Sequence, residues 1–202
     1  MNQMVLQNIT YGLFLISVKD GEKDNACIVN TVMQVAYTPN RISVAVSKDN
    51  LTHEMIQNTG FYNASIISKD ADFALFQRFG LQSGRDVDKF QDFSAVSRSE
   101  NGLYYLTEQT NGFLSVKVEQ QVDLGTHTLF IGTMTDGEIL AETEPCTYAY
   151  YHTDIKKLPK EESSAKGWRC NICGYVHEGE DLPDDFICPW CKHGAEDFTK
   201  IV

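Results

Sequence analysis

Short runs of apolar and β-branched residues recur through the first 150 residues, and they predict a mainly β domain. The predicted strands are residues 11–18, 26–37, 41–47, 61–68, 103–108, 112–125 and 127–140. A turn is expected at 38–40, and the Asp136-Gly137 pair predicts a turn inside the last run. Helical spacing predicts two short helices at 51–60 and 71–80, each ending at a glycine. Several strands, few helices and no strand–helix–strand alternation favour a barrel or a sandwich.

The pattern changes abruptly at residues 152–167, HTDIKKLPKEESSAKG. This segment is charged, contains a proline and has almost no apolar residues. Such a composition cannot bury enough surface to offset the entropy lost on ordering. We therefore predict a larger domain at 1–151, a linker at 152–166 and a small, mobile domain at 167–202. The alternative is an ordered strap that lies on the larger domain.

The acidic composition limits the classes of partner. The 202 residues carry a formal net charge of −11. Nucleic acids and anionic membranes attract clustered Lys and Arg, so neither is an expected partner, whereas a protein with a basic docking face is. No export signal is visible, and no apolar stretch approaches the roughly 18 residues of a membrane span. We expect a cytoplasmic protein, in which thiols stay reduced.

Four of the six cysteines form two C-x-x-C pairs near the end of the sequence: Cys170, Cys173, Cys188 and Cys191. Two such pairs place four thiolates around one tetrahedral ion, and soft sulfur ligands select zinc or iron. A disulfide oxidoreductase needs only one C-x-x-C pair. The spacing therefore predicts a metal site but does not decide between the two metals.

The residues around the cysteines resemble a rubredoxin. The resemblance lies in the stretch WRCNICGYVHEGEDLPDDFICPWC and a later phenylalanine. It implies a single iron held by the four cysteines and a small aromatic core of Trp168, Tyr175, Phe186 and Phe198. A domain this small needs a metal because burial alone cannot stabilise it. Two departures are that the gap between the cysteine pairs is short and that Lys192 replaces the usual glycine of the second pair. Structural zinc remains the alternative.

Iron held by four cysteines has no open coordination position and passes one electron at a time. A nicotinamide donates two electrons as a hydride, so a flavin is expected upstream. Residues 1–155 resemble the flavin reductase-like, FMN-binding split-barrel family, the flavoredoxin group. The resemblance rests on three motifs in the family's order: NTVMQVAYTPNRISVAVSKDNLTHEMI, FGLQSGRDVDKF and GTHTLFIGTM. It implies a split β-barrel homodimer with FMN near the subunit interface.

The same resemblance implies a set of FMN-binding residues. The ring would meet Asn30, Thr31, Val32 and Gln34, the phosphate would meet Ser47, Lys48, Asn50 and Thr52, and Gly80, Ser83, Arg85 and Lys89 would complete the site. Asn50 and Thr52 could instead form an ordinary helix cap. Arg85 and Lys89 could be solvated surface charges, and His127 could line the site or be structural. Cys27 and Cys146 match no motif and are predicted to be buried, reduced thiols.

The whole chain resembles the flavoredoxin–rubredoxin fusions called high-molecular-weight rubredoxins. The resemblance implies an NAD(P)H-dependent electron-transfer flavoprotein whose acceptor is a flavodiiron protein or another terminal oxidoreductase, in the detoxification of O2 or nitric oxide. Acidic residues of the small domain would steer it to a basic partner: Glu178, Glu180, Asp181, Asp184 and Asp185. The alternatives are an FMN and iron relay reduced by another flavoprotein, and a non-enzymatic split barrel with a zinc ribbon.

Overall fold

The computed structural model describes residues 9–156, 167–171, 174–190 and 193–201. The strands of the larger domain are β1 (Phe14–Asp20), β2 (Lys23–Val29), β3 (Met33–Ala36), β4 (Arg41–Ser47), β5 (Phe61–Ile67), β6 (Val96–Arg98), β7 (Tyr104–Leu106), β8 (Thr110–Asp123) and β9 (His127–Ile139). Its helices are α1 (Leu51–Thr59), α2 (Phe73–Gly80) and α3 (Tyr148–Tyr150), followed by a π-helical turn at Tyr151–Ile155. The C-terminal strands are β10 (Gly167–Cys170), β11 (Val176–Glu178) and β12 (Phe198–Ile201), with a 3-10 turn at Ala195–Asp197.

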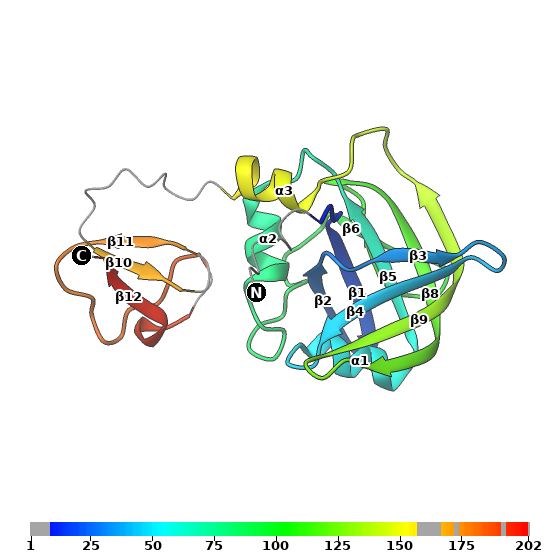
Figure 1. Cartoon of the computed structure of the whole chain (residues 1–202), viewed down its shortest axis with the longest axis horizontal. Helices are drawn as coiled ribbons and strands as arrows, with labels where there is room; N and C mark the ends of the chain where they lie inside the picture. The colour runs from blue at the N-terminus through cyan, green and yellow to red at the C-terminus, as the bar shows by residue number, and fades with distance from the viewer. Residues whose placement is uncertain (1–8, 157–166, 172–173, 191–192, 202) are drawn as a thin grey trace.

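Seven antiparallel strands of the larger domain form one curved sheet in the order β2-β1-β5-β8-β9-β4-β3 (Figure 1). The two edge strands, β2 and β3, are consecutive in the chain and only residues 30–32 separate them. Because so short a connection holds both edges close together, the sheet closes into a barrel that is split at this point. The mainly β fold and the barrel predicted from the sequence are confirmed.

Two apolar clusters lie on opposite faces of the sheet. One fills the barrel and includes Ile16, Val44 and Phe130, with Met55 and Ile56 of α1 packed into it. The other lies under α2 and α3 on the outside of β1, β2 and β5. Strand β1 contributes to both clusters, which explains why its sequence is an almost continuous apolar run rather than an alternating one.

Three local predictions were wrong. The stretch 26–37 is two strands, because the chain crosses between the sheet edges at 30–32, and β2 already begins at Lys23. The Asp136-Gly137 pair does not turn: β9 runs through it, and Gly137 pairs with Leu114 of β8. A side chain at Gly137 would approach the Phe113 carbonyl oxygen to 3.0 Å, so this glycine permits close strand approach. By contrast, Gly60 ends α1 in the left-handed conformation, as predicted.

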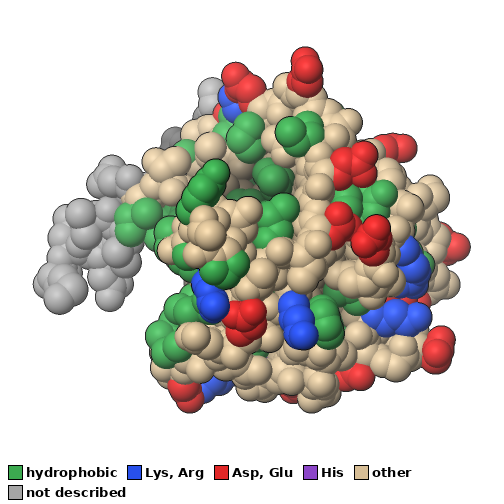
Figure 2. Space-filling view, turned by 90° about the vertical axis from the view of Figure 1, so that its right-hand side faces the viewer, with side chains coloured by type: hydrophobic (Ala, Val, Ile, Leu, Met, Phe, Trp, Pro, Cys, Tyr) green, Lys and Arg blue, Asp and Glu red, His purple; other side chains and the backbone are tan. Residues whose placement is uncertain are grey.

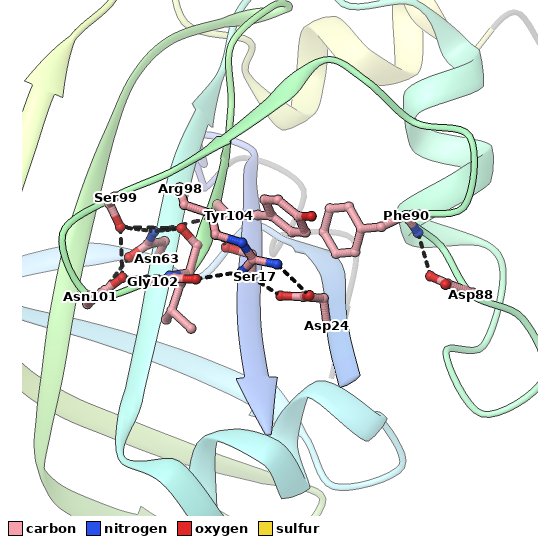
Figure 3. A network of polar contacts seen from close by, with 11 residues as sticks. Ser17, Asp24, Asn63, Asp88, Phe90, Arg98, Ser99, Asn101, Gly102 and Tyr104 are labelled. Atoms are coloured by element: carbon pink, nitrogen blue, oxygen red, sulfur yellow. Dashed lines mark hydrogen bonds and ion pairs between the residues drawn. The ribbon is translucent and has the colours of Figure 1, made fainter. Parts of the chain in front are cut away.

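A buried polar network fixes the loop that carries β6 and β7 to the barrel wall (Figure 3). Its centre is Asn63 of β5, which is fully buried. The partners of the Asn63 amide are Ser99 Oγ (2.8 Å), the Leu103 (3.1 Å) and Tyr104 (3.2 Å) carbonyl oxygens, Asn101 Nδ2 (2.8 Å) and Ser115 Oγ (2.7 Å). Arg98 forms a bidentate ion pair with Asp24 and lies 3.8 Å from the centre of the Tyr104 ring. These contacts hold the start of β2 in place.

The C-terminal domain is a three-stranded sheet in the order β11-β10-β12. Its core consists of Cys170, Cys188 and Phe198, which are all buried. The predicted aromatic residues Trp168, Tyr175 and Phe186 pack against this core, and Trp190, which was not predicted, joins them. Gly174 adopts the left-handed conformation (φ 81°) that the turn after the first cysteine pair requires. Cys173, Cys191 and Lys192 lie outside the described residues.

The part of the predicted linker that the structure describes is not extended. Residues Tyr151–Ile155 form the helical turn that follows α3, and Ile155 packs against the outer cluster of the larger domain. Residues 157–166 lie outside the described residues. Among the residues that are described, no helix combines the length and apolar character that crossing a membrane requires.

Candidate functional site

The N-terminus of α1 lies at the centre of the predicted phosphate site. The Asn50 side chain accepts a hydrogen bond from the Thr52 N–H (3.1 Å), so it caps the helix, as the alternative interpretation proposed. The Thr52 hydroxyl is buried and accepts a hydrogen bond from Asn25 of β2 (2.9 Å). Cys27 is buried beside them, and burial raises the pKa of its thiol, although hydrogen bonds with Thr52 and Asn50 act in the opposite direction. Each of these side chains therefore helps to position the first turn of α1.

The loop after α2 packs against this helix end. Gly84 lies so close to Asn25 that a Cβ atom there would come within 2.1 Å of Asn25 Oδ1. Arg85 forms an exposed two-point ion pair with Glu54 in the first turn of α1 (2.5 and 3.2 Å), which lowers the pKa of Glu54. Ser83 Oγ accepts a hydrogen bond from the Arg85 N–H (3.1 Å). The fold thus brings the predicted Ser83 and Arg85 beside α1.

Strands β4 and β9 complete this cluster. Ser47 pairs directly with His127, and the Lys48 N–H donates to the Thr126 carbonyl oxygen (3.0 Å). Lys48 also forms an ion pair with Asp123 (2.8 Å), and this hydrogen bond lowers the pKa of Asp123. The fold therefore places His127 beside the predicted phosphate loop, whether it lines the site or is structural.

A buried histidine, His53, lies on α1. His53 Nε2 is 2.7 Å from Thr128 Oγ1, and burial lowers the pKa of the imidazole. Its Nδ1 atom has no hydrogen-bond partner among the described residues. His53 and Lys48 line a cavity of about 450 Å³ beside β8 and β9. The Lys48 ammonium and the His53 Nδ1 atom are therefore available to a ligand at this site.

Lys89 is not a solvated surface charge. It is 3% exposed, and its ammonium donates to the carbonyl oxygens of Ala26 (2.9 Å) and Phe79 (3.0 Å). Burial lowers its pKa to about 8. The side chain thus ties the loop after α2 to β2 and α2, and a direct contact with FMN stays a prediction.

The predicted ring-binding residues lie at the split between β2 and β3. Thr31 Oγ1 donates to the Ala45 carbonyl oxygen (2.7 Å) and accepts from its N–H (3.2 Å), so its side chain holds the connection to β4. Val32 packs against the barrel core, and exposed Gln34 bonds to Asn40 (3.2 Å). Asn30 faces a separate cavity of about 290 Å³.

This cavity lies between the end of β2 and the helices α2 and α3. Asn30 and Gly80 are the two predicted FMN-binding residues that line it, together with Leu81, Tyr148 and Tyr151. A Cβ atom at Gly80 would lie 3.3 Å from Ile28, so the glycine lets α2 approach β2 closely. We call this cavity the β2–α2 cavity.

The two groups of residues suit a flavin mononucleotide. Both border β2: Asn25 and Cys27 lie at the helix end, and Asn30, directly after the last residue of β2, lies at the β2–α2 cavity. At about 3.3 Å per residue, Asn30 is roughly 10 Å from Cys27 and roughly 16 Å from Asn25. Such a separation suits a ligand whose phosphate and ring are joined by a flexible chain. A helix N-terminus with a lysine, an arginine and hydroxyl groups nearby suits a phosphate.

The C-terminal domain suits a metal ion held by thiolates. Cys170 and Cys188 come from different cysteine pairs, yet both are buried in one small cluster. The Cys170 N–H donates to the Tyr175 carbonyl oxygen (2.8 Å), and the Cys188 N–H donates to that of His193 (2.8 Å), so both ligand loops are fixed by the backbone. The other two predicted ligands lie outside the described residues.

The residues of this region that sequence reasoning missed include Asn25, His53, Glu54, Leu81 and Gly84. Gly84 and Leu81 lie inside the motif FGLQSGRDVDKF, so the motif itself could have indicated them. Asn25 and Glu54 act through contacts with residues at least 27 positions away in sequence, for which no local pattern exists.

Comparison with known proteins finds a matching family for each of the two domains. The model of the "Flavin reductase like domain" family matches residues 6–159. The model of the "Rubrerythrin, rubredoxin-like domain" family matches residues 168–199. Among solved structures, an NADH:FAD oxidoreductase from Streptomyces globisporus has the same fold with a TM-score of 0.64, at 18% identity over 72% of this chain and 85% of the other.

Curated relatives cover the chain in full or in part. A "High molecular weight rubredoxin" from Moorella thermoacetica is 36% identical over the whole length of both chains. A "Ferric-chelate reductase (NAD(P)H)" from Archaeoglobus fulgidus is 31% identical over 75% of this chain and 90% of its own. A "Putative diflavin flavoprotein" from Nostoc is 23% identical over 68% of this chain, which corresponds to 24% of that larger protein.

Proposed function

Since the chain belongs to the flavin reductase-like family and continues into a rubredoxin-like domain, we propose that it takes electrons from NAD(P)H and delivers them singly to a partner oxidoreductase. The family makes it an oxidoreductase whose cofactors are FMN and iron. When bound, FMN would accept the two electrons of a hydride and give them up one at a time, and the iron would alternate between its ferric and ferrous states. Each hydride therefore supplies two single-electron deliveries and leaves one proton for the solvent.

The larger domain supplies binding and orientation for this chemistry. Lys48, Arg85 and the N-terminus of α1 would hold the phosphate, and the β2–β3 connection with Asn30 would hold the ring edge. The ion pairs of Lys48 with Asp123 and of Arg85 with Glu54 keep both cations in place beside the helix. The roles of the remaining predicted residues, including His127, are part of this proposal.

One observation carries the proposal. Two cysteines from separate C-x-x-C pairs are buried together in a small aromatic core, in the same chain as a split barrel of the flavin reductase fold. A closed four-thiolate centre cannot bind a substrate, so its use beside a flavin site is electron transfer. The domain boundaries 1–151, 152–166 and 167–202 belong to the same proposal.

We propose a flavodiiron protein as the acceptor, with reduction of O2 or nitric oxide as the outcome. Two observations support a protein acceptor. The diflavin flavoprotein from Nostoc contains a stretch similar to this flavin reductase-like domain within a longer chain, which supports a partnership with a second flavoprotein unit. The acidic residues at 178–185 of the rubredoxin-like domain are exposed and suit a basic docking face.

A homodimer is also part of the proposal. Edge strand β3 and the turn after it expose Met33 (61%), Val35 (45%) and Tyr37 (83%). The hairpin of β3 and β4 extends to the right in Figure 1, and Figure 2, viewed from that side, shows hydrophobic side chains among charged ones. A second copy would cover this edge. The cytoplasm remains the predicted location.

The proposal can be tested by measuring delivery to a purified flavodiiron protein. The full chain, supplied with NAD(P)H, should reduce the acceptor. A chain that ends at Lys156 should still reduce its flavin, but its rate of electron delivery to the acceptor should fall at least about tenfold. Raising the salt concentration should slow delivery by the full chain, because charges are screened beyond roughly 8 Å at physiological ionic strength. Equal rates of electron delivery by both chains would show that the rubredoxin-like domain does not pass electrons to the acceptor.

The same assay distinguishes a nicotinamide donor from the alternative donor, a second flavoprotein. If neither NADH nor NADPH reduces the flavin while a second, reduced flavoprotein does, the chain is a relay rather than a nicotinamide-dependent reductase.

A further inference from the structure

The rubredoxin-like domain contacts the larger domain at both ends of α2. At the first residue of α2, the Phe73 ring meets the Trp190 ring edge to face, with centroids 5.2 Å apart. Just past the last residue of α2, Leu81 packs against the cluster formed by Cys170, Cys188 and Phe198. Figure 1 shows the C-terminal domain on the side of the barrel that carries α2.

Leu81 also lies at the β2–α2 cavity of the larger domain. It lines the β2–α2 cavity together with Val29, Asn30 and Gly80. One side chain therefore lies between the cavity at the predicted flavin edge and the buried cysteines of the metal centre. No other described residue of the larger domain both lines a described cavity and packs on this cysteine cluster.

The part of the small domain that faces α2 is the second cysteine loop. Trp190 lies between Cys188 and Cys191 in the sequence, so its contact with Phe73 brings this loop to the barrel. Trp190 also packs edge to face on Tyr175, at 5.5 Å, within the core of its own domain. The contact thus involves the metal-binding core and not only a surface loop.

We infer that Phe73 and Leu81 form an internal docking surface for the second cysteine loop, and that electrons pass from the larger domain to the metal centre across Leu81. This inference rests on the proposed function and names the surface and the partner of its internal step. The interface is the α2 face of the same chain, and the occupant is the rubredoxin-like domain itself.

The chemical character of the contact between the two domains differs from that of the proposed contact with an external acceptor. The residues that touch are apolar or aromatic, and none of the ion pairs among the described residues joins the two domains. Salt should therefore leave the internal step unchanged. The acidic residues at 178–185 remain available for a separate, salt-sensitive contact with the acceptor.

The experiment compares the holoprotein with Leu81→Asp, with Phe73→Gln and with a matched control, Ile139→Asp. Ile139 is an exposed aliphatic residue (84%) at the end of β9, outside all three hydrophobic clusters. Small-angle X-ray scattering measures the radius of gyration, and anaerobic stopped-flow absorbance measures the rate of iron reduction after flavin reduction. Flavin and iron spectra identify variants that fold.

The wild type and Ile139→Asp should have the same radius of gyration and the same rate, independent of protein concentration and salt. A carboxylate in this partly buried apolar contact opposes docking, so Leu81→Asp should expand the chain and slow iron reduction about tenfold, the effect of weakening docking by roughly 1.4 kcal/mol. Phe73→Gln should have a smaller effect in the same direction. Unchanged scattering and rate in both variants would overturn the inference. If the wild type itself does not reduce its iron, the proposed function fails, and the scattering still decides whether the domains dock.

Discussion

Replacing Cys188 with serine should remove the iron and its absorbance while leaving about one FMN per chain. The Cys188 side chain is fully buried in the small core, and its position in the second C-x-x-C pair predicts that it is one of four thiolate ligands. Serine is a poor ligand for a soft-sulfur site, and a domain this small depends on its metal for stability. The predicted FMN-binding residues belong to the larger domain, which has its own two apolar clusters. Metal analysis and flavin release measure both cofactors.

The matched control is Cys146→Ser. Cys146 is equally buried, but it lies in the outer cluster of the larger domain, where burial raises the pKa of its thiol to about 11. This variant should keep its iron. Loss of both cofactors from Cys188→Ser would contradict the account, since it would show that the two domains fold as one unit.

Replacing Gly84 with valine should have the reciprocal effect, with weak FMN binding and intact iron. A Cβ atom at this position would lie 2.1 Å from Asn25 Oδ1, so the loop or Asn25 must move. Movement of Asn25 breaks its hydrogen bond to Thr52 at the start of α1. Overpacking of this kind costs about 1–3 kcal/mol; if this cost falls on the FMN-binding conformation, FMN should bind roughly 5- to 150-fold more weakly. Equilibrium titration of the apoprotein with FMN measures the affinity.

Asp86→Val is the control for this loop, because Asp86 is exposed and only two residues away. It should bind FMN nearly as the wild type does. An unchanged affinity in Gly84→Val would contradict the assignment of the loop after α2 to the FMN site.

The sequence predicted the features that depend on local patterns. The runs of β-branched residues predicted most strands of the barrel, and Gly60 predicted the end of α1, because these signals act within a few residues. The aromatic residues around the cysteines predicted the small core. The sequence left open whether His127 lines the site or is structural, and the pairing of Ser47 with His127 places it beside the predicted phosphate loop.

The features that the sequence did not predict depend on contacts between distant residues. Asp136-Gly137 has the composition of a turn, but β8 is long enough to pair with β9 through it. The sequence alone predicts that Lys89 either contacts FMN or is a surface charge, but it does not predict its burial, which the Ala26 and Phe79 carbonyl oxygens of β2 and α2 make possible. The contact of Leu81 with the cluster of Cys170, Cys188 and Phe198 joins residues 89 to 117 positions apart, which no local pattern specifies.

Anaerobic titration of the purified full chain with NADH or NADPH, followed by visible absorbance, tests the central claim most directly. The account predicts that a nicotinamide alone bleaches both the flavin and the iron, with about 1.5 equivalents per chain, because the flavin takes two electrons and the iron takes one. A flavin that is fully reduced beside an iron that stays oxidised would contradict transfer between the two centres. A colourless protein that contains zinc and no flavin would contradict the whole account.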